Sequence, residues 1–224
     1  EMCASAKYYD DDTLRDMDYV ITTRELAKWA KEEVIEFTAL EDSSYDDFMG
    51  EASGAGVIFG NTGGVMEAAL RTAYEFIEHQ PAPLDLLQLT PLRGYDGIRE
   101  SAVYMGESLV HVAVVYGTAN LRKFLDLLKS GEKQYHFVEV MTCPGGCIGG
   151  GGQPKNILKD KDVVRKSRIQ SLYQKDASMT IRKSHENPDI KRIYQEFYGK
   201  PLSELAEKML HTCYEDRSNT LHVK

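Results

Sequence analysis

The sequence lacks any apolar run of the roughly 18 residues that a membrane-spanning helix requires, so we expect no membrane span. It also lacks an excess of basic side chains, because 27 Lys and Arg residues stand against 35 Asp and Glu residues and give a formal net charge of -8. This acidic balance argues against nucleic acid as a partner. No stretch has the pattern of a signal peptide, and a chain that opens at Glu1 has the form of a processed protein or of a piece of a longer one.

Cysteine is scarce as well, since the 224 residues hold four cysteines, at Cys3, Cys143, Cys147 and Cys213. A chain of this length can bury a core of its own, and it is not of the small, cysteine-dense secreted type that depends on disulfides. We therefore expect reduced cysteines that are either bound to metal or buried.

Helical and strand patterns interleave along the sequence. Thr22 and Glu25 have capping-box spacing before one helix, and further helical patterns cover 65–77, 118–129, 161–173, the segment from Asn187 and the segment after Pro201. Strand patterns cover 19–22, 84–93, 101–105, 109–115 and 135–141. These patterns predict an α/β fold in which a small mixed sheet is flanked by helices. We expect the lone Trp29 to lie in the core.

The segment 142–154 follows a predicted strand and combines cysteine with glycine. Cys143 and Cys147 lie four residues apart, and glycines fill positions 145, 146 and 149–152. Glycine lets a bulky group approach the backbone closely, and its N–H groups can point at an anion or at cluster sulfides. Thiolates are the usual ligands of iron–sulfur clusters. From these residues alone, we expect a metal site about as readily as another use of the loop.

Other uses of this segment are weaker or incomplete. A phosphate-binding loop would end in Gly-Lys-Ser/Thr or open a helix with G-x-G-x-x-G, and neither pattern is present. A structural zinc site would add a second pair of cysteines, which the sequence does not have. A disulfide between Cys143 and Cys147 would be strained across the two glycines.

The stretch Glu139-Val-Met-Thr-Cys-Pro-Gly-Gly-Cys-Ile-Gly-Gly-Gly-Gly-Gln-Pro154 resembles the third signature of the FeFe (iron-only) hydrogenases. Segments 54–74, 182–188 and 19–26 resemble further blocks of the same family, in the expected order and over nearly the whole chain. The resemblance implies that residues 1–224 are the C-terminal part of the catalytic domain. This part would form one lobe of a two-lobed domain, together with C-terminal helices.

The catalytic domain of this family holds the H-cluster, a 4Fe–4S cubane joined through a cysteine sulfur to a two-iron unit with CO, cyanide and a bridging dithiolate. The resemblance implies that Cys143 binds the cubane and that Cys147 binds the cubane and bridges to the two-iron unit. It places Met141 against the two-iron unit. It makes Phe59 a wall of the same pocket, although an ordinary core position would suit Phe59 nearly as well.

The second family signature reads Met-Pro-Cys, two variable residues and Lys. Here the matching text runs from Met2 to Lys7, with Cys3 where the proline belongs and Ala4 where the cysteine belongs. We nevertheless expect Cys3 to ligate the cubane and Lys7 to face a cyanide of the two-iron unit. Cys213 matches no ligand position, and we expect it to be a buried or free thiol.

The first family signature, Thr-Ser-Cys-Cys-Pro, is absent from the sequence. It supplies the remaining cubane ligand and a proton-transferring cysteine, so we expect a preceding segment or a second chain to provide that lobe. The implied activity is reversible interconversion of protons, electrons and H2, with ferredoxin or an NADH-linked subunit as redox partner. We expect a cytoplasmic location, with the periplasm left open. Two alternatives stay open: a sensory hydrogenase of low activity, and a non-catalytic relative used in iron–sulfur assembly.

Overall fold

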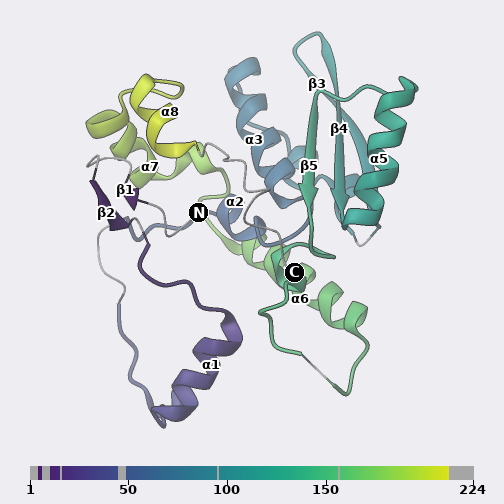
Figure 1. Ribbon diagram of the computed structural model, residues 1–224. Helices are drawn as coiled ribbons and strands as arrows, with labels where there is room; N and C mark the ends of the chain where they lie inside the picture. Colours follow the sequence, from purple (N-terminus) through teal and green to yellow (C-terminus); the bar gives the residue numbers. More distant parts are fainter. Residues whose placement is uncertain are drawn as a thin grey trace. The chain divides into compact units, whose positions relative to one another are not determined.

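The computed structural model describes residues 5–6, 11–15, 17–44, 49–94, 96–155 and 157–211. The chain divides into two compact units, one formed by Thr22–Ile190 and the other by Glu1–Ile21 with Lys191–Lys224. The larger unit holds the sheet and most helices, which are labelled in Figure 1. In the part of the chain that is described, no helix is long and apolar enough to cross a membrane.

The larger unit is built on a mixed three-stranded sheet, and the predicted small mixed sheet flanked by helices is confirmed. Strands β3 (Ile98–Met105) and β4 (Ser108–Tyr116) form an antiparallel hairpin that turns at Gly106, where φ is +61°. Strand β5 (Phe137–Met141) pairs in parallel with β4, which makes the strand order β3-β4-β5. The parallel pairing requires a crossover, and α5 (Thr118–Ser130) provides it.

Helices cover both faces of this sheet (Figure 1). Because successive side chains of a strand point to opposite faces, Val112 and Val114 of β4 pack with the cluster that includes α3 (Gly64–Glu78). The alternate residues Ala113 and Val115 pack against Phe124 of α5. All four β4 residues are fully buried, so this strand is the centre of the core.

A second core joins a short helix, the cysteine-containing loop and a long helix. Ile58 of α2 (Gly54–Ile58), Ile148 of the loop, and Ile169 and Tyr173 of α6 (Lys161–Ser178) form this cluster. The Ser53 hydroxyl caps α2 by accepting from the Gly56 N–H at 3.2 Å. No helical pattern predicts α2, because three of the residues from 54 to 60 are glycines.

Local signals in the sequence are reproduced at several helix ends. The Thr22 hydroxyl accepts from the Glu25 N–H and the Glu25 carboxylate accepts from the Thr22 N–H, so α1 (Thr23–Glu32) begins with the predicted capping box. Asn187 caps α7 (Pro188–Ile193) through its side-chain oxygen. The larger unit also contains short helices at Phe37–Ala39 (η1), Cys147–Gly149 (η3) and Ser184–Glu186 (η4).

The smaller unit contains a two-stranded antiparallel sheet and the C-terminal helices. Strands β1 (Ser5–Ala6) and β2 (Asp11–Arg15) pair with each other. A π-helical turn, η5 (Tyr194–Tyr198), precedes α8 (Glu204–Leu210), which is capped by the Ser203 hydroxyl.

Three expectations about local structure were wrong. The segment 84–93 forms the short helices α4 (Leu84–Leu87) and η2 (Thr90–Leu92) instead of a strand, because its buried residues Leu86, Leu89 and Leu92 recur every third position. Segment 19–22 forms no strand and is exposed. Trp29 is 57% exposed instead of lying in the core. Both of these last errors concern apolar residues whose side chains are more than half exposed.

Candidate functional site

The two central cysteines lie on the loop that leaves β5. The strand ends at Met141, and the Met141 carbonyl accepts from the Gly117 N–H at 2.8 Å, which fixes the strand end against the end of β4. Cys143 is half-buried, Cys147 is exposed, and both are free thiols. Two accessible thiols, four residues apart, therefore lie on the loop that begins at the end of β5.

Glycine is required where this loop touches its neighbour. Gly146 has a φ of +91°, a left-handed conformation that side chains disfavour. A Cβ atom at this position would lie 2.7 Å from the Thr62 nitrogen and 2.8 Å from the Gly60 oxygen, both of which belong to the backbone. The loop can approach segment 60–62 only without a side chain at Gly146.

Backbone hydrogen bonds fasten the loop to that segment. The Thr62 N–H donates to the Gly145 carbonyl at 3.1 Å, and the Ile148 N–H donates to the Gly60 carbonyl at 3.2 Å. Phe59 precedes Gly60 directly, so the chain that carries Phe59 runs beside the cysteines. The Phe59 side chain is 44% exposed in this structure.

Glu139 ties the same strand to the start of α3. Its buried carboxylate accepts from the Gly63 N–H at 2.6 Å and from the Met66 N–H at 2.7 Å. The first N–H groups of a helix have no partner within the helix, and they carry the positive end of its dipole. Burial raises the pKa of Glu139, while these hydrogen bonds lower it. Glu139 therefore holds segment 60–63 and the cysteine loop in one arrangement.

Buried polar groups lie behind the loop. Arg99 donates to the Thr62 carbonyl at 3.0 Å and to the Gly94 carbonyl at 2.5 Å, and burial lowers its pKa. Among the described residues, four buried atoms in this region have no hydrogen-bond partner: Asn61 Oδ1, Thr62 Oγ1, Arg99 Nε and Tyr173 Oη. These polar atoms therefore lie beside the apolar cluster of Ile58, Ile148 and Ile169.

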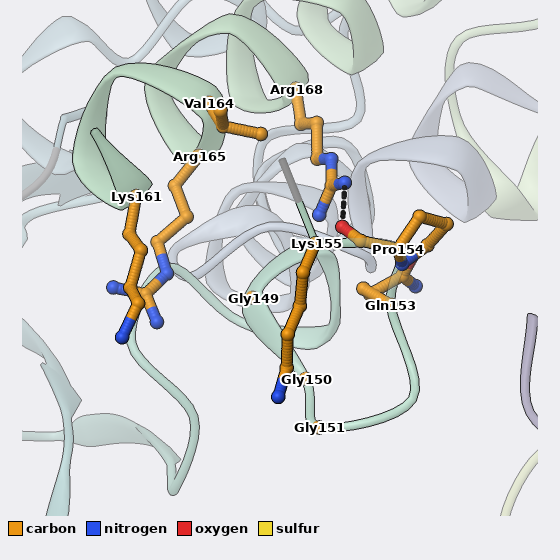
Figure 2. Close-up of a pocket in the computed structure, with 10 residues that line it drawn as sticks. All are labelled: Gly149, Gly150, Gly151, Gln153, Pro154, Lys155, Lys161, Val164, Arg165 and Arg168. Carbon is orange, nitrogen blue, oxygen red and sulfur yellow. Dashed lines mark hydrogen bonds between the residues drawn. The ribbon is translucent and has the colours of Figure 1, made fainter. Parts of the chain in front are cut away.

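A basic cavity of about 220 Å³ opens on the C-terminal half of the loop (Figure 2). The Arg168 guanidinium donates to the carbonyls of Ile148 at 2.8 Å and Pro154 at 2.7 Å, and so clamps the loop to α6. The side chains of Lys155, Lys161 and Arg165 also line the cavity. This positive charge beside the loop favours an anionic group there.

A buried ion network lies deeper, between α3 and α6. Arg71 is fully buried and donates to Glu67 at 2.8 Å and to both carboxylate oxygens of Asp176, at 2.9 and 2.8 Å. Arg93 forms a further ion pair with Glu67, and Arg182 forms a further ion pair with Asp176. Sequence reasoning missed this network; the spacing of four between Glu67 and Arg71 was its one local signal.

A second charged group, Glu75 with His185 and Glu186, has the composition of a metal site, but a lysine pairs with both of its carboxylates. The ligand atoms of the three residues lie within 4.8 Å of one another. The Lys183 ammonium lies 2.6 Å from both the Glu75 and the Glu186 carboxylate. Lys183 therefore supplies the positive charge that a metal ion would bring, and the group ties α3 to η4.

The structure brings together four of the six predicted site residues. Cys143, Cys147 and Met141 share one strand and loop, and the segment of Phe59 is hydrogen-bonded to that loop. The other two, Cys3 and Lys7, lie outside the described residues, as does Cys213.

Sequence comparisons assign the chain to a family. The profile described as "Iron only hydrogenase large subunit, C-terminal domain" matches residues 3–151, and the profile described as "Iron hydrogenase small subunit" matches residues 161–217. Iron hydrogenase 1 of Clostridium pasteurianum is 48% identical over 95% of this chain. The match covers 38% of that relative, so the chain spans well under half of its length.

Comparison with solved structures agrees with the sequence match. A variant of the FeFe-hydrogenase from Chlamydomonas reinhardtii superposes with a TM-score of 0.73 at 41% identity. The superposition covers 92% of this chain and 57% of that one. The α/β fold, with its three-stranded sheet, is therefore the fold of this part of an FeFe-hydrogenase.

More distant relatives have another role in their names. Cytosolic iron-sulfur assembly component 3 of Bos taurus is 32% identical over 89% of this chain, and 41% of its own length is covered. The identity to the Clostridium hydrogenase is higher, at 48% over 95% of the chain.

Proposed function

This chain belongs to the iron-only hydrogenase family, and we propose that it is the C-terminal part of a domain that catalyses reversible H2 oxidation and proton reduction at an H-cluster. The observation that supports this best is the pair of free thiols, Cys143 and Cys147, on a glycine loop fastened at both ends. A cluster ligand must be accessible yet fixed, and this loop meets both conditions.

The residues present fit such a cluster in their chemistry. Cys143 and Cys147 would act as thiolate ligands, and Cys147, the more exposed of the two, would bridge to the two-iron unit. Glycines leave the loop backbone open for close approach, and basic side chains stand beside it. When bound, the cluster would supply the redox chemistry and the open iron position at which H2 is made or split.

The remaining site residues would shape the surroundings of the two-iron unit. Met141 would contact it with a polarizable thioether that does not ionise. Phe59 would exclude water from it, which strengthens every electrostatic contact inside. Lys7 would donate to a cyanide, a charge-assisted contact, and Cys3 would be a further cubane ligand.

Glu139 and Arg168 would act at a distance by holding the loop. The Glu139 carboxylate holds segment 60–63, which Gly146 contacts. The Arg168 guanidinium holds Ile148, next to Cys147. Rigid ligands keep a cluster from rearranging as its charge changes.

The chain would not complete this site alone. It carries no Thr-Ser-Cys-Cys-Pro signature, and it spans 38% of the Clostridium relative. The remaining cubane ligand and the proton-transferring groups would come from a preceding segment or a second chain. Electrons would pass between the cubane and ferredoxin or an NADH-linked subunit.

Infrared spectroscopy of the assembled and matured protein tests this proposal. Bands of bound CO and cyanide are expected, because the two-iron unit of the proposed H-cluster would carry both ligands. A cubane signal by electron paramagnetic resonance, without those bands in protein co-expressed with the maturation machinery, would contradict the hydrogenase proposal.

The second candidate is a relative used in iron–sulfur assembly, which would bind cubanes without a two-iron unit. The 32% identity to the bovine assembly component favours it. A sensory hydrogenase is a variant of the first proposal, supported by the altered signature from Met2 to Lys7. Turnover of H2 by the assembled protein separates a sensory hydrogenase from a catalytic one, because a sensory protein would show CO and cyanide bands with slow turnover.

A further inference from the structure

A buried arginine on β3 lies behind the segment that supports the cysteine loop. Arg99 pairs with Val114 of β4 in the sheet, so its side chain leaves the sheet on the face that packs against α3. The residue is only 6% exposed. Arginine is almost never buried to this extent unless another group compensates its charge.

No carboxylate forms an ion pair with Arg99 in the part of the chain that the structure describes. Its guanidinium donates to the carbonyls of Thr62 and Gly94, and among the described atoms its Nε–H has no hydrogen-bond partner. Glu139 attracts it from a longer distance, but the Glu139 oxygens accept from the backbone at the start of α3. Carbonyl oxygens are therefore the direct partners of this cation.

Arg71, the other arginine that is buried among the described residues, has the compensation that Arg99 lacks. The Arg71 guanidinium lies 2.8 Å from the carboxylates of both Glu67 and Asp176. A buried charge without such a partner is costly, and a nearby anion removes that cost. The surroundings of Arg99 therefore suit an anionic group that these residues do not themselves provide.

One residue joins Arg99 to the cysteine loop. The Arg99 guanidinium donates to the Thr62 carbonyl at 3.0 Å, and the Thr62 N–H donates to the Gly145 carbonyl at 3.1 Å. Gly145 lies between Cys143 and Cys147 in the sequence. The buried positive charge is therefore connected through Thr62 to the loop that carries the two thiols.

We propose that the charge of Arg99 stabilises the reduced form of the cubane on Cys143 and Cys147 and so raises its reduction potential. The inference rests on the proposed function, since it requires a cubane at these two thiols. A cubane held by four thiolates carries a net negative charge, and the electron that it takes from the redox partner adds another. A fixed positive charge in a low-dielectric interior therefore favours the reduced form. Arg99 acts through Thr62 and the loop, which makes it a positioning residue.

A purely structural role of Arg99, as a clamp between Thr62 and Gly94, makes different demands on the side chain. A clamp depends on the hydrogen bonds to the two carbonyls, whereas the electrostatic effect depends on the charge. Lysine keeps the charge but loses the planar fork of donors. Glutamine keeps an amide donor but is neutral. Substitution by each of these residues therefore separates the two roles.

Redox titration of the complete, matured protein, followed by electron paramagnetic resonance, tests the proposal. At the potential where the parent cubane is half reduced, we expect Arg99→Gln to lower the ratio of reduced to oxidised cubane about tenfold. For a one-electron couple, this corresponds to about 59 mV. Arg99→Lys should keep the ratio within about threefold of the parent value. A ratio for Arg99→Gln that also stays within about threefold, or equal shifts in both variants, would overturn the proposal.

Two further variants support this measurement. Arg99→Met is a second neutral variant, which fills the space with an apolar chain and is measured in place of Arg99→Gln if that protein does not fold. The same limit of about threefold applies to it. Arg122→Met is the matched control, because this arginine is exposed on α5 in a weak pair with Asp126. We expect the parent ratio for the control, and a shift as large as that of the buried variants would overturn the assignment to Arg99.

Infrared spectra of the same samples separate this inference from the proposed function. CO and cyanide bands with an unchanged cubane ratio in the neutral Arg99 variants would leave the hydrogenase proposal standing and reject the role of Arg99. A lowered ratio in matured protein without those bands would support the role of Arg99 and reject the hydrogenase proposal. Bands together with the lowered ratio would support both.

Discussion

Two separate constraints, backbone conformation and space, require glycine at position 146. Its φ of +91° costs an ordinary residue ~1–2 kcal/mol, and the backbone of Gly60 and Thr62 occupies the space of a Cβ atom. Both demands follow from the contact between the cysteine loop and segment 60–62, so a substitution here tests how firmly the ligands are held.

We predict that Gly146→Ala lowers both the thermal unfolding midpoint and the iron content of the assembled protein. The loop must move away from segment 60–62, which displaces Cys147 directly after it. Gly151→Ala is the control, because its Cβ would meet nothing within 4 Å. Equal iron content in the two variants would show that the loop does not depend on this contact.

Hydrogen bonds from neighbouring groups stabilise the ionised carboxylate of Glu75. It accepts from the Lys183 ammonium, the Ala82 N–H and the His185 ring. Burial raises the pKa of Glu75, but these hydrogen bonds outweigh it and bring the pKa down to about 2. A carboxylate with a depressed pKa stabilises the fold above its ordinary pKa, and that contribution is lost as the pH falls through the lowered value.

We predict that the stability contributed by Glu75 is full above about pH 4.5 and declines between pH 4.5 and 2. Glu75→Gln should therefore be less stable than the parent protein at pH 6, and the difference should shrink toward pH 2. Urea unfolding at a series of pH values measures this, with Glu33→Gln on an exposed side chain as control. A constant difference across the pH range would contradict the assignment.

At the level of elements, the buried ion network joins α3 to α6. Arg71 bridges Glu67, on its own helix, and Asp176, which lies 105 residues away in sequence. Gly54 packs against Asp176 so closely that a Cβ atom would overlap the carboxylate. The network therefore fixes α2, α3 and α6, the three helices around the segment that supports the loop.

We predict that Arg71→Met destabilises the protein by about 3–5 kcal/mol, because it leaves buried carboxylates with fewer partners. The expected loss for Arg122→Met, in the exposed pair with Asp126, is about 0–1 kcal/mol. Chemical denaturation of both variants gives the comparison. Similar losses would mean that Arg93 and Arg182 compensate for the missing guanidinium.

Strand β5 shows how an element positions chemistry. Its alternation sends Glu139 into the interior and leaves Val140 exposed. The parallel pairing with β4 ends at Tyr116 and Met141, so the strand stops where the cysteine loop begins. A shift of one residue in the register between β5 and β4 would turn the Glu139 side chain to the opposite face of the sheet, away from α3.

For the protein as a whole, the match covers 38% of the Clostridium hydrogenase, and the Thr-Ser-Cys-Cys-Pro signature of the family is absent from the sequence. We therefore predict that the 224-residue chain alone, after exposure to the maturation machinery, shows no CO or cyanide bands and contains less iron than the assembled protein. Iron analysis and infrared spectra of both samples provide the test. A complete cluster on the chain alone would show that no further lobe is needed.

Elements whose signals are local could be predicted from the amino-acid sequence. The capping box at Thr22 and Glu25, the hairpin at Gly106 and the Asn187 cap depend on residues within a few positions of each other. The cysteine loop could be predicted as well, because cluster ligation requires particular residues at a fixed spacing. These features needed no knowledge of distant parts of the chain.

Contacts between residues that are distant in sequence could not be predicted and became visible in the folded chain. The contact of Glu139 with α3 spans more than 70 residues, and the Arg71–Asp176 pair spans 105, so neither leaves a mark in a local pattern. The same reason explains the errors. Apolar residues indicated a buried strand at 19–22 and a core position for Trp29, but burial depends on packing partners that are distant in sequence, and these side chains are exposed.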